Sequence, residues 1–452
     1  MSVSSLILSP QEWAALYRRD DGEQQPISPV EQEFGAESFG KRHGLEVIRA
    51  IMEAWGEPQL RYPTVHVAGS KGKGSTVAIL SSILRAAGYR VGSYTSPSLT
   101  HFGERIQVDG RPISDEEAEA YVAQMRPVLP HLPDRPKFFE VATAIAFQHF
   151  ARQRVDVAVI EVGIGGRLDA TNVVMPELTV ITSIELEHTH VLGDTLEMIA
   201  VEKAGIIKPD VPTVTGVADP EALEAIEQVS VERGSPLWRL GAEFDVSHIR
   251  GERTKQRFDL RLGPELGDER LQDLALGLPG EAQSANASLA VVVARRLRDR
   301  FGRLTDSAIR SGLCDARWPG RLELIEGRPN VLLDVAHTPA SAHQLRRHLD
   351  EFFADIPKTL VIGMLRDKRH HHVAAELGGA FDQIIAAPVK WFRSLEVDVL
   401  REAFSSYHDE VETAPSVCSA IELALRTTPP NGLIVVAGSL FAVGEAKRRF
   451  GW

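Results

Sequence analysis

The sequence is poor in the features that mark secreted, zinc-stabilised or membrane-spanning proteins. Its 452 residues include only two cysteines, Cys314 and Cys418, and no Cys-x-x-Cys pair. This excludes a disulfide framework and a structural zinc site, and it is typical of a reducing compartment. The longest apolar segment, from Leu433, is about half as long as a membrane span. Because the N-terminus also lacks a basic region and a cleavage motif, we expect a cytoplasmic protein without a membrane partner.

The chain also lacks an excess of positive charge. Its 50 Lys and Arg residues stand against 62 Asp and Glu residues, which gives a formal net charge of −12. An acidic chain repels the phosphate backbone, so we expect no nucleic-acid partner, although a local basic pocket for one nucleotide is compatible with this charge. The hydrophobic content of 43% is that of a globular protein, and 452 residues are too many for one ordinary core. The length therefore indicates at least two domains.

Apolar segments alternate with helical patterns along most of the chain. The segments at 64–69, 90–96, 155–163 and 177–184 are predicted to be strands, with helices between them. Strands that are apolar throughout imply a parallel sheet covered by helices on both faces. Residues 244–262 instead alternate apolar and polar side chains and predict an antiparallel hairpin. Four further apolar segments after residue 303 predict a second, smaller α/β domain: 330–337, 358–365, 382–389 and 432–439.

A glycine-rich segment, HVAGSKGKGSTV at residues 66–77, lies between the first predicted strand and a predicted helix. Backbone N–H groups in such a turn, together with the positive end of a helix, form an anion site, where Lys73 would neutralise phosphate charge. The spacing matches a Walker A motif only in part, because Gly69 precedes Gly72 by three residues and Gly74 intervenes before the hydroxyls. The residues alone are compatible with a phosphate cradle or with a glycine-rich turn that binds nothing.

Polar residues follow other predicted strands. Glu161 ends an apolar strand, at the sheet edge that faces the ligand crevice in open α/β folds, and a carboxylate near a phosphate cradle suits Mg²⁺. The alternative is an ordinary salt bridge. Asp169, in the glycine-rich turn that follows, is a candidate to bind a polar ligand. His188 also follows a strand, where the alternative is a structural histidine.

Three further groups have both a functional and an ordinary interpretation. Lys203 lies in an amphipathic helix, where the pattern alone favours a solvated lysine. Asp334 and His337 follow a buried strand and would project into a crevice, unless they form a helix cap and a surface histidine. The histidines at 370–372 resemble a metal cluster, but adjacent helical residues point to different faces. We therefore predict a helix start with solvated histidines there.

Taken together, these stretches resemble the folylpolyglutamate synthase and dihydrofolate synthase family of the Mur ligase superfamily, from about residue 42 to the C-terminus. The resemblance rests on HVAGSKGKGST, YTSPSL, GERI, FEVATAIAF, EVGIGGRLDATN, EHTHVLGDTLEMIAVEKAGIIK, WPGRLE and LLDVAHTP, which occur in the family's order. It implies a P-loop-containing parallel-sheet ATPase domain followed by a smaller Rossmann-like α/β domain. We accordingly expect an N-terminal arm at 1–41, an ATP-binding domain at 42–302 and a glutamate-ligase domain at 303–452.

The resemblance also implies an activity. Members of this family are ATP-dependent amide ligases that activate a carboxylate as an acyl phosphate, which the amine of an amino acid then attacks. The implied partners are ATP, L-glutamate and a folate or dihydropteroate, and the chain is expected to be a monomer. The implied cofactors are ATP, two Mg²⁺ ions and a carbamylated Lys203, and the resemblance allows a monovalent cation.

The family's functional positions can be carried over one by one onto this sequence. ATP contacts are implied for Gly69, Ser70, Lys71, Gly72, Lys73, Gly74, Ser75, Asn286, Arg321 and Asp334. Magnesium ligands are implied at Ser96, Glu161 and His188. Lys73, Lys203 and His337 are the implied catalytic residues, and Asp169 matches a position near the pterin.

The sequence departs from the family pattern at a few positions. Lys71 replaces an asparagine, Ser98 a histidine, Gly103 an arginine and Val47 an arginine, while Thr338 stands in the AHNP motif. Because the departures concern mainly the folate side, a Mur-type ligase with a different carboxylate acceptor is an alternative. A third hypothesis is an inactive ATP-binding relative. The joint presence of seven residues argues against it: Lys73, Ser96, Glu161, His188, Lys203, Asp334 and His337.

Overall fold

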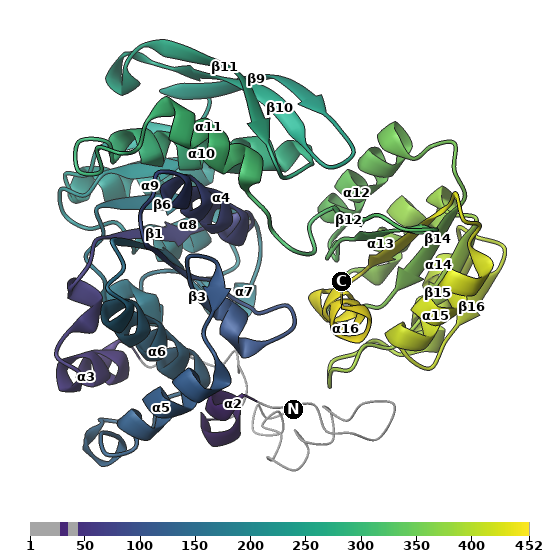
Figure 1. The fold of residues 1–452 in the computed structure, drawn as a ribbon, viewed down its shortest axis with the longest axis horizontal. Helices are drawn as coiled ribbons and strands as arrows, with labels where there is room; N and C mark the ends of the chain where they lie inside the picture. Colours follow the sequence, from purple (N-terminus) through teal and green to yellow (C-terminus); the bar gives the residue numbers. More distant parts are fainter. Residues whose placement is uncertain (1–27, 35–43, 452) are drawn as a thin grey trace.

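The computed structural model describes residues 28–34 and 44–451, which fold around an eight-stranded, a three-stranded and a six-stranded sheet (Figure 1). The first two sheets and their helices form a first unit, and the six-stranded sheet forms a second. This confirms the predicted α/β architecture. Most of the arm expected at 1–41 lies outside the described residues. Residues 28–34 contain α2 (Pro29–Phe34), whose Val30 is fully buried and which packs on α5 and α6.

The eight-stranded sheet has the order β4-β3-β2-β5-β1-β6-β7-β8 and is parallel from β2 to β8. Its central strands are buried over their whole length, as predicted for a sheet covered on both faces. The edge strands β3 and β4 pair antiparallel. The strands are β1 (Thr64–Ala68), β2 (Val91–Tyr94), β3 (Ile106–Val108), β4 (Arg111–Pro112), β5 (Val157–Glu161), β6 (Leu178–Ile181), β7 (Thr213–Thr215) and β8 (Leu237–Arg239).

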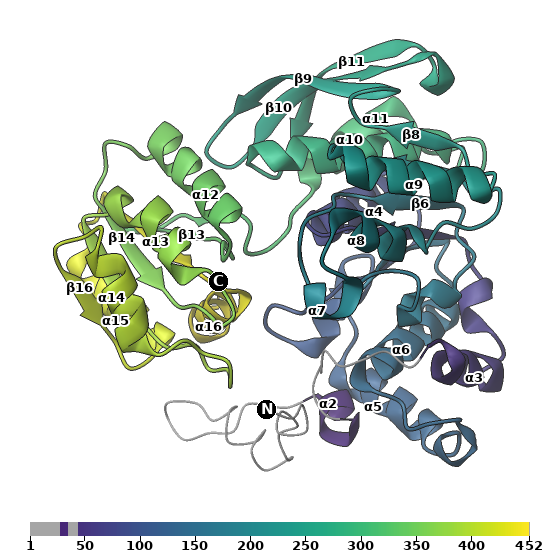
Figure 2. The same cartoon turned by 180° about the vertical axis from the view of Figure 1, so that it is seen from behind.

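Helices cover both faces of this sheet, and alternate residues of each strand point into different cores. Val157 and Val159 face the core beneath α4, α10 and α11, whereas Ala158 and Ile160 face the core around α6. Figure 2 shows α8 and α9 side by side on the molecule. The helices are α3 (Glu46–Ala54), α4 (Lys73–Ala86), α5 (Asp115–Met125), α6 (Phe138–Gln153), α7 (Thr189–Leu192), α8 (Leu196–Ala204), α9 (Pro220–Glu232), α10 (Glu281–Arg296) and α11 (Asp306–Asp315). Short 3-10 helices lie at Pro58–Leu60, Phe102–Arg105, Leu129–His131, Ala170–Val173 (η5), Pro264–Leu266 and Gly378–Ala380.

The predicted hairpin is present and has a third strand that the sequence did not indicate. β9 (Phe244–Gly251) and β10 (Gln256–Leu262) pair antiparallel, and β11 (Glu269–Leu276) pairs with β10 on the other side. Helix α11 follows the boundary expected after residue 302, yet it packs directly on α4. A Cβ added to its Gly312 would lie 2.3 Å from the Cα of Ile83. The first core therefore continues past residue 302, and we propose a domain boundary between Ala316 and Leu322.

The second unit is a six-stranded sheet in the order β12-β13-β17-β14-β15-β16, parallel except at β12. Its strands are β12 (Glu323–Ile325), β13 (Asn330–Leu333), β14 (Lys358–Ile362), β15 (Gln383–Ala386), β16 (Val411–Thr413) and β17 (Leu433–Ala437). Its helices are α12 (Pro339–Phe352), α13 (His370–Leu377), α14 (Val397–Ser405), α15 (Val417–Thr427) and α16 (Leu440–Phe450). The histidine run begins α13, with His371 and His372 exposed, as predicted.

The two units touch through a loop of the first and the last helix of the second. The Arg448 guanidinium donates to the Thr100 carbonyl at 3.2 Å, and a Cβ on Gly444 would lie 2.2 Å from the Leu99 carbonyl oxygen. The carboxyl ends of the two sheets' strands, together with helices α4, α8 and α10, supply the residues described next. Among the described residues, no helix combines the length and the apolar character that crossing a membrane requires.

Candidate active site

The glycine-rich segment connects β1 to α4, where the sequence predicted a strand–helix turn. Three of its glycines lie against other parts of the chain, so that a side chain would collide there. An added Cβ would lie 1.9 Å from Thr182 Oγ1 at Gly69 and 2.2 Å from Asn286 Oδ1 at Gly72. At Gly74 it would lie 2.6 Å from the ring of Trp318. Gly69 and Gly72 also have φ angles of +142° and +84°, which side-chain-bearing residues rarely adopt.

The loop after β6 holds the glycine-rich turn in place. The Ser70 N–H donates to the Ser183 carbonyl at 2.7 Å, and the Lys71 N–H donates to Ser183 Oγ at 2.9 Å. Thr182 Oγ1 donates to the Lys71 carbonyl at 2.5 Å. These bonds order the turn without using the side chains of Lys71 or Lys73. The turn is thus a preformed loop at a helix N-terminus, which is the arrangement that binds phosphate.

Lys73 lies at the centre of the charged groups of this site. Its Nζ donates to the carbonyls of Gly69 at 2.9 Å and Ser70 at 3.2 Å. Its positive charge contributes to the pKa shifts of four other groups: Glu161, Glu187, His188 and Lys203. Lys73 therefore lies within electrostatic range of two predicted metal ligands and of the predicted carbamylated lysine.

Lys203 is not the solvated lysine that its helical pattern favoured. Its side chain is 1% exposed, and its Nζ donates to the Gly69 carbonyl at 2.9 Å and to Glu187 Oε1 at 3.0 Å. Burial and then the charge of Lys73 lower the pKa of Lys203 to about 8, although Glu187 opposes the shift. Helix α8 is thereby bonded directly to the glycine-rich turn.

Glu187 is a site residue that the sequence analysis missed, although it directly precedes His188. Its carboxylate bonds Lys203 on one side and forms an ion pair with Lys71 Nζ at 3.5 Å on the other. Burial alone would raise the pKa of Glu187, but Lys73, Lys203 and Lys71 together lower it to about 2. The signal that could have identified it is the carboxylate itself, placed just after a strand that neighbours the glycine-rich turn. Lys71, the unusual lysine of the turn, thus has a carboxylate partner.

The backbone of Ser96 contacts the Glu161 carboxylate directly, and the role of both residues as metal ligands stays a prediction. The Ser96 N–H donates to Glu161 Oε2 at 3.1 Å, and Glu161 is 3% exposed. Burial raises the pKa of Glu161 to about 7, against the opposing charges of Lys73, Arg321 and Arg105. Arg105 also donates to Ser98 Oγ at 3.3 Å, so the serine that replaces the family's histidine has a structural partner.

His188 was predicted to bind a metal and Asp169 to lie near the pterin, and their surroundings differ. Burial and the nearby lysines lower the pKa of His188 to about 4, so its ring is neutral and able to bind a cation. Asp169 is fully buried. Its carboxylate accepts from the N–H groups of Gly163 and Ile164 at 3.1 Å and of Thr171 at 3.0 Å. Asp169 therefore shapes the glycine-rich loop after β5.

Asp334 and His337 of the second unit lie on its side that faces the first unit. Arg321 lies near one carboxylate of each unit. Asp334 accepts from the N–H groups of Leu322 and Ala336, each at 2.8 Å. The Arg321 guanidinium interacts electrostatically with Asp334 and with Glu161. His337 Nδ1 bonds the Val335 carbonyl at 2.8 Å, and burial and then Lys71 lower its pKa to about 4. Asn286, from α10, lies against the glycine-rich turn and donates to Gln283 Oε1 at 3.0 Å.

The predicted metal ligands do not form a complete set of ionisable side chains. Within residues 28–34 and 44–451, no three His, Cys, Asp or Glu side chains converge as a complete metal site. The predicted set contains two such side chains and a serine, so it depends on oxygen donors of other kinds. The buried Glu161 carboxylate, which contacts the Ser96 backbone, nevertheless suits a hard cation.

Comparison with known proteins places this geometry in a family. Residues 67–294 match the Mur ligase middle domain, and residues 320–440 match the Mur ligase glutamate ligase domain. The dihydrofolate synthase/folylpolyglutamate synthase of Bacillus subtilis is 37% identical over 422 residues, 92% of this chain and 96% of that protein. The folylpolyglutamate synthase of Lacticaseibacillus casei is 35% identical over 407 residues, 89% of this chain and 93% of that one.

A solved structure agrees with these sequence matches. The Mycobacterium tuberculosis folylpolyglutamate synthase complexed with ADP has a TM-score of 0.82 at 34% identity, covering 90% of this chain and 94% of that one. Together the two family matches lie in both units, and each relative covers about nine tenths of the chain. The chain belongs to the folylpolyglutamate synthase and dihydrofolate synthase family of the Mur ligases.

Proposed function

We propose that the protein is an ATP-dependent ligase that joins L-glutamate to a folate-type carboxylate and releases ADP and phosphate. The observation that carries this proposal is the placement of Lys73. It lies in a preformed phosphate-binding turn, within electrostatic range of Glu161, His188 and Lys203. The folylpolyglutamate synthase relative was solved with ADP, which supports nucleotide binding by this fold.

The turn and the helix behind it would hold the ATP phosphates. Backbone N–H groups at the start of α4 would donate to the phosphate oxygens, and the helix dipole favours negative charge there. Lys73 Nζ, which donates to the Gly69 and Ser70 carbonyls, would turn to the phosphates as they bind. It would then stabilise charge on the phosphoryl group as the folate-type carboxylate becomes an acyl phosphate.

Ser96, Glu161 and His188 would hold Mg²⁺, which supplies charge neutralisation on the phosphates when bound. The ionisation of Glu161 indicates whether these residues suit Mg²⁺. Its buried carboxylate has a pKa of about 7 without a metal, so a nearby cation would restore the ionised form. Neutral His188 offers a nitrogen to the same cation.

We further propose that Lys203 is carbamylated in the active protein. The pKa of about 8 leaves a fraction of neutral amine, which is the form that reacts with CO₂. Glu187 would then keep Lys71 as its cationic partner. Protein equilibrated with ¹³C-bicarbonate is expected to give a carbamate ¹³C NMR signal that Lys203→Met abolishes. A signal that persists in Lys203→Met would contradict the assignment.

The second unit would complete the site around the nucleotide and the incoming amino acid. Asn286 lies against the turn, and Arg321 and Asp334 would contact the nucleotide from the other unit. His337 donates from Nδ1 to a carbonyl, which leaves Nε2 free to accept a hydrogen bond from the amine of glutamate. Asp169 would position the loop that lines the folate side.

Phosphate release from ATP in the presence of glutamate tests the function directly. The arms contain dihydropteroate, tetrahydrofolate or no acceptor. We expect release with at least one pteroate compound and little without an acceptor, and the responsive compound distinguishes dihydrofolate synthase from folylpolyglutamate synthase activity. ATP binding without release in any arm would contradict the proposal. The cytoplasmic location and the monomeric state stay predictions from the sequence.

A further inference from the structure

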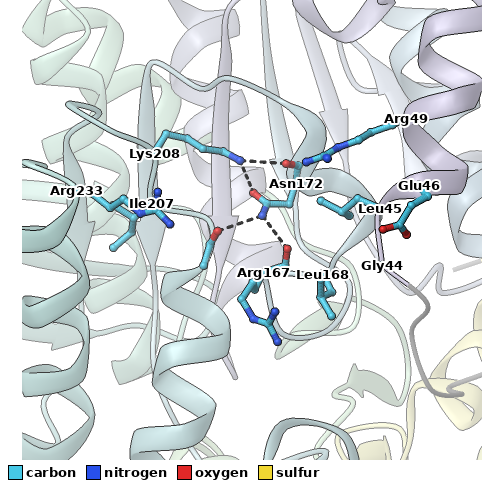
Figure 3. A pocket seen from close by; sticks show the side chains of 11 residues that line it. Gly44, Leu45, Glu46, Arg49, Arg167, Leu168, Asn172, Ile207, Lys208 and Arg233 are labelled. Carbon is cyan, nitrogen blue, oxygen red and sulfur yellow. Dashed lines mark hydrogen bonds between the residues drawn. The ribbon is translucent and has the colours of Figure 1, made fainter.

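A pocket of about 340 Å³ lies between the start of α3, the loop after β5 and the segment that follows α8 (Figure 3). Arg233, at the end of α9, closes its far side. None of the residues proposed to bind ATP, metal or glutamate lines it. We call it the basic pocket, because Arg49, Arg167, Lys208 and Arg233 line it against a single acid, Glu46.

Little of this positive charge is neutralised. Arg167 has its own partner, since it bonds Glu202 Oε1 at 2.6 Å. The carboxylate of Glu46 turns back over Gly44, where an added Cβ would lie 2.2 Å from Glu46 Oε2. Within the part of the chain that the structure describes, no carboxylate forms an ion pair with Arg49, Lys208 or Arg233. Lys208 Nζ instead donates to two neutral acceptors, the Asn172 carbonyl at 3.0 Å and Asn172 Oδ1 at 2.8 Å.

The charges of two arginines, Arg49 and Arg233, act on Lys208. Burial, followed by the charges of Arg49 and Arg233, lowers the pKa of Lys208 to about 8. In Figure 3, Arg49 and Arg233 approach from opposite sides of the Lys208–Asn172 pair. Converging like charges are unfavourable unless an anion joins them. The pocket also offers apolar surface from Leu45, Leu168 and Ile207.

We propose that the basic pocket binds a phosphate group, either as free phosphate or as part of a phosphate monoester. A dianion matches the surplus of positive charge, and each guanidinium can donate two parallel hydrogen bonds to phosphate oxygens. The Asn172 side chain fixes Lys208 beside them. The apolar wall and the volume leave room for the organic part of a monoester.

Titration calorimetry on the full chain tests the proposal, with ADP and Mg²⁺ saturating the nucleotide site, at low salt and without phosphate buffer. The probes are inorganic phosphate and phenyl phosphate. We expect saturable binding, which the double variant Arg49→Gln/Arg233→Gln weakens by at least about tenfold. Both arginines are exposed, so the variant is expected to fold, and its circular dichroism melt verifies this. Tighter binding of phenyl phosphate would identify a monoester site, and equal binding a site for free phosphate.

Two controls separate this site from others. Arg111→Gln removes an exposed arginine of β4 and is expected to leave binding unchanged. Lys73→Met is also expected to leave it unchanged, because Lys73 belongs to the other site. Three outcomes would overturn the proposal: no saturable binding, binding that survives the double variant, or binding lost with Lys73→Met.

Discussion

Replacing Lys73 with methionine is expected to lower kcat/KM for ATP by roughly 10³-fold, because the charge that stabilises the transferred phosphoryl group is lost. Lys73 is also the largest charge that opposes the raised pKa of Glu161, so its loss would leave that carboxylate protonated to higher pH. Steady-state phosphate release measures the effect, and ADP titration separates binding from turnover.

Lys71 provides a matched control in the same turn. Its side chain is 43% exposed, and its ion pair with Glu187 spans 3.5 Å. A partly exposed ion pair contributes about 0–1 kcal/mol of interaction free energy. Because about 1 kcal/mol corresponds to about fivefold, Lys71→Met is expected to change kcat/KM by less than about fivefold. Equal losses of kcat/KM in the two variants would show that only the total positive charge of the turn matters. That result would contradict a specific role for Lys73.

Replacing Glu161 with glutamine is expected to abolish magnesium-dependent turnover and yet stabilise the metal-free protein at pH 8. The folded pKa of about 7 exceeds the ordinary value of 4.5, so folding binds a proton more tightly. Below pH 4.5 the carboxyl is neutral in both states and has no charge to bury. As the pH rises towards 7, the cost of the buried charge grows to roughly 3 kcal/mol.

Melting temperatures measured in chelator across pH 4.5–8 test this effect. At pH 8 the Glu161→Gln variant is expected to melt at a higher temperature than the parent protein. This difference in melting temperature is expected to shrink as the pH falls towards 4.5. Glu187→Gln is the control with the opposite sign. Its folded pKa of about 2 lies below 4.5, so its charge stabilises the fold at neutral pH, and that stability is lost only as the pH falls below 4.5. Near-normal magnesium-dependent activity of Glu161→Gln would refute the metal assignment.

The strands around the site could be predicted because their signal is local. Val157–Glu161 is apolar almost throughout and became a fully buried strand, and the same holds for Thr64–Ala68. The third strand of the small sheet, Glu269–Leu276, escaped prediction because charged residues interrupt its apolar positions. Its partner, β10, supplies the pairing that its own pattern does not reveal.

The site's charge network could not be predicted, because it depends on contacts distant in sequence. The helix pattern alone favoured a solvated Lys203, because it contains no information about the turn that covers this side chain, and only the family resemblance placed Lys203 in the site. Glu187 gains its role only when the loop after β6 returns to the turn. Nothing in the sequence indicated that the Asp169 carboxylate accepts from backbone N–H groups, because only the folded loop defines their positions. The place of Asp169 near a ligand stays a prediction.

The three glycines of the glycine-rich turn have a consequence for segment exchange between relatives. Gly69, Gly72 and Gly74 each leave space for a side chain from a different segment: Thr182, Asn286 and Trp318. The turn is therefore not a portable module that can be grafted alone. A chimera that inherits the turn must also inherit the loop after β6, helix α10 and the connection between the two units. Substitutions in these segments are therefore expected to occur together among relatives.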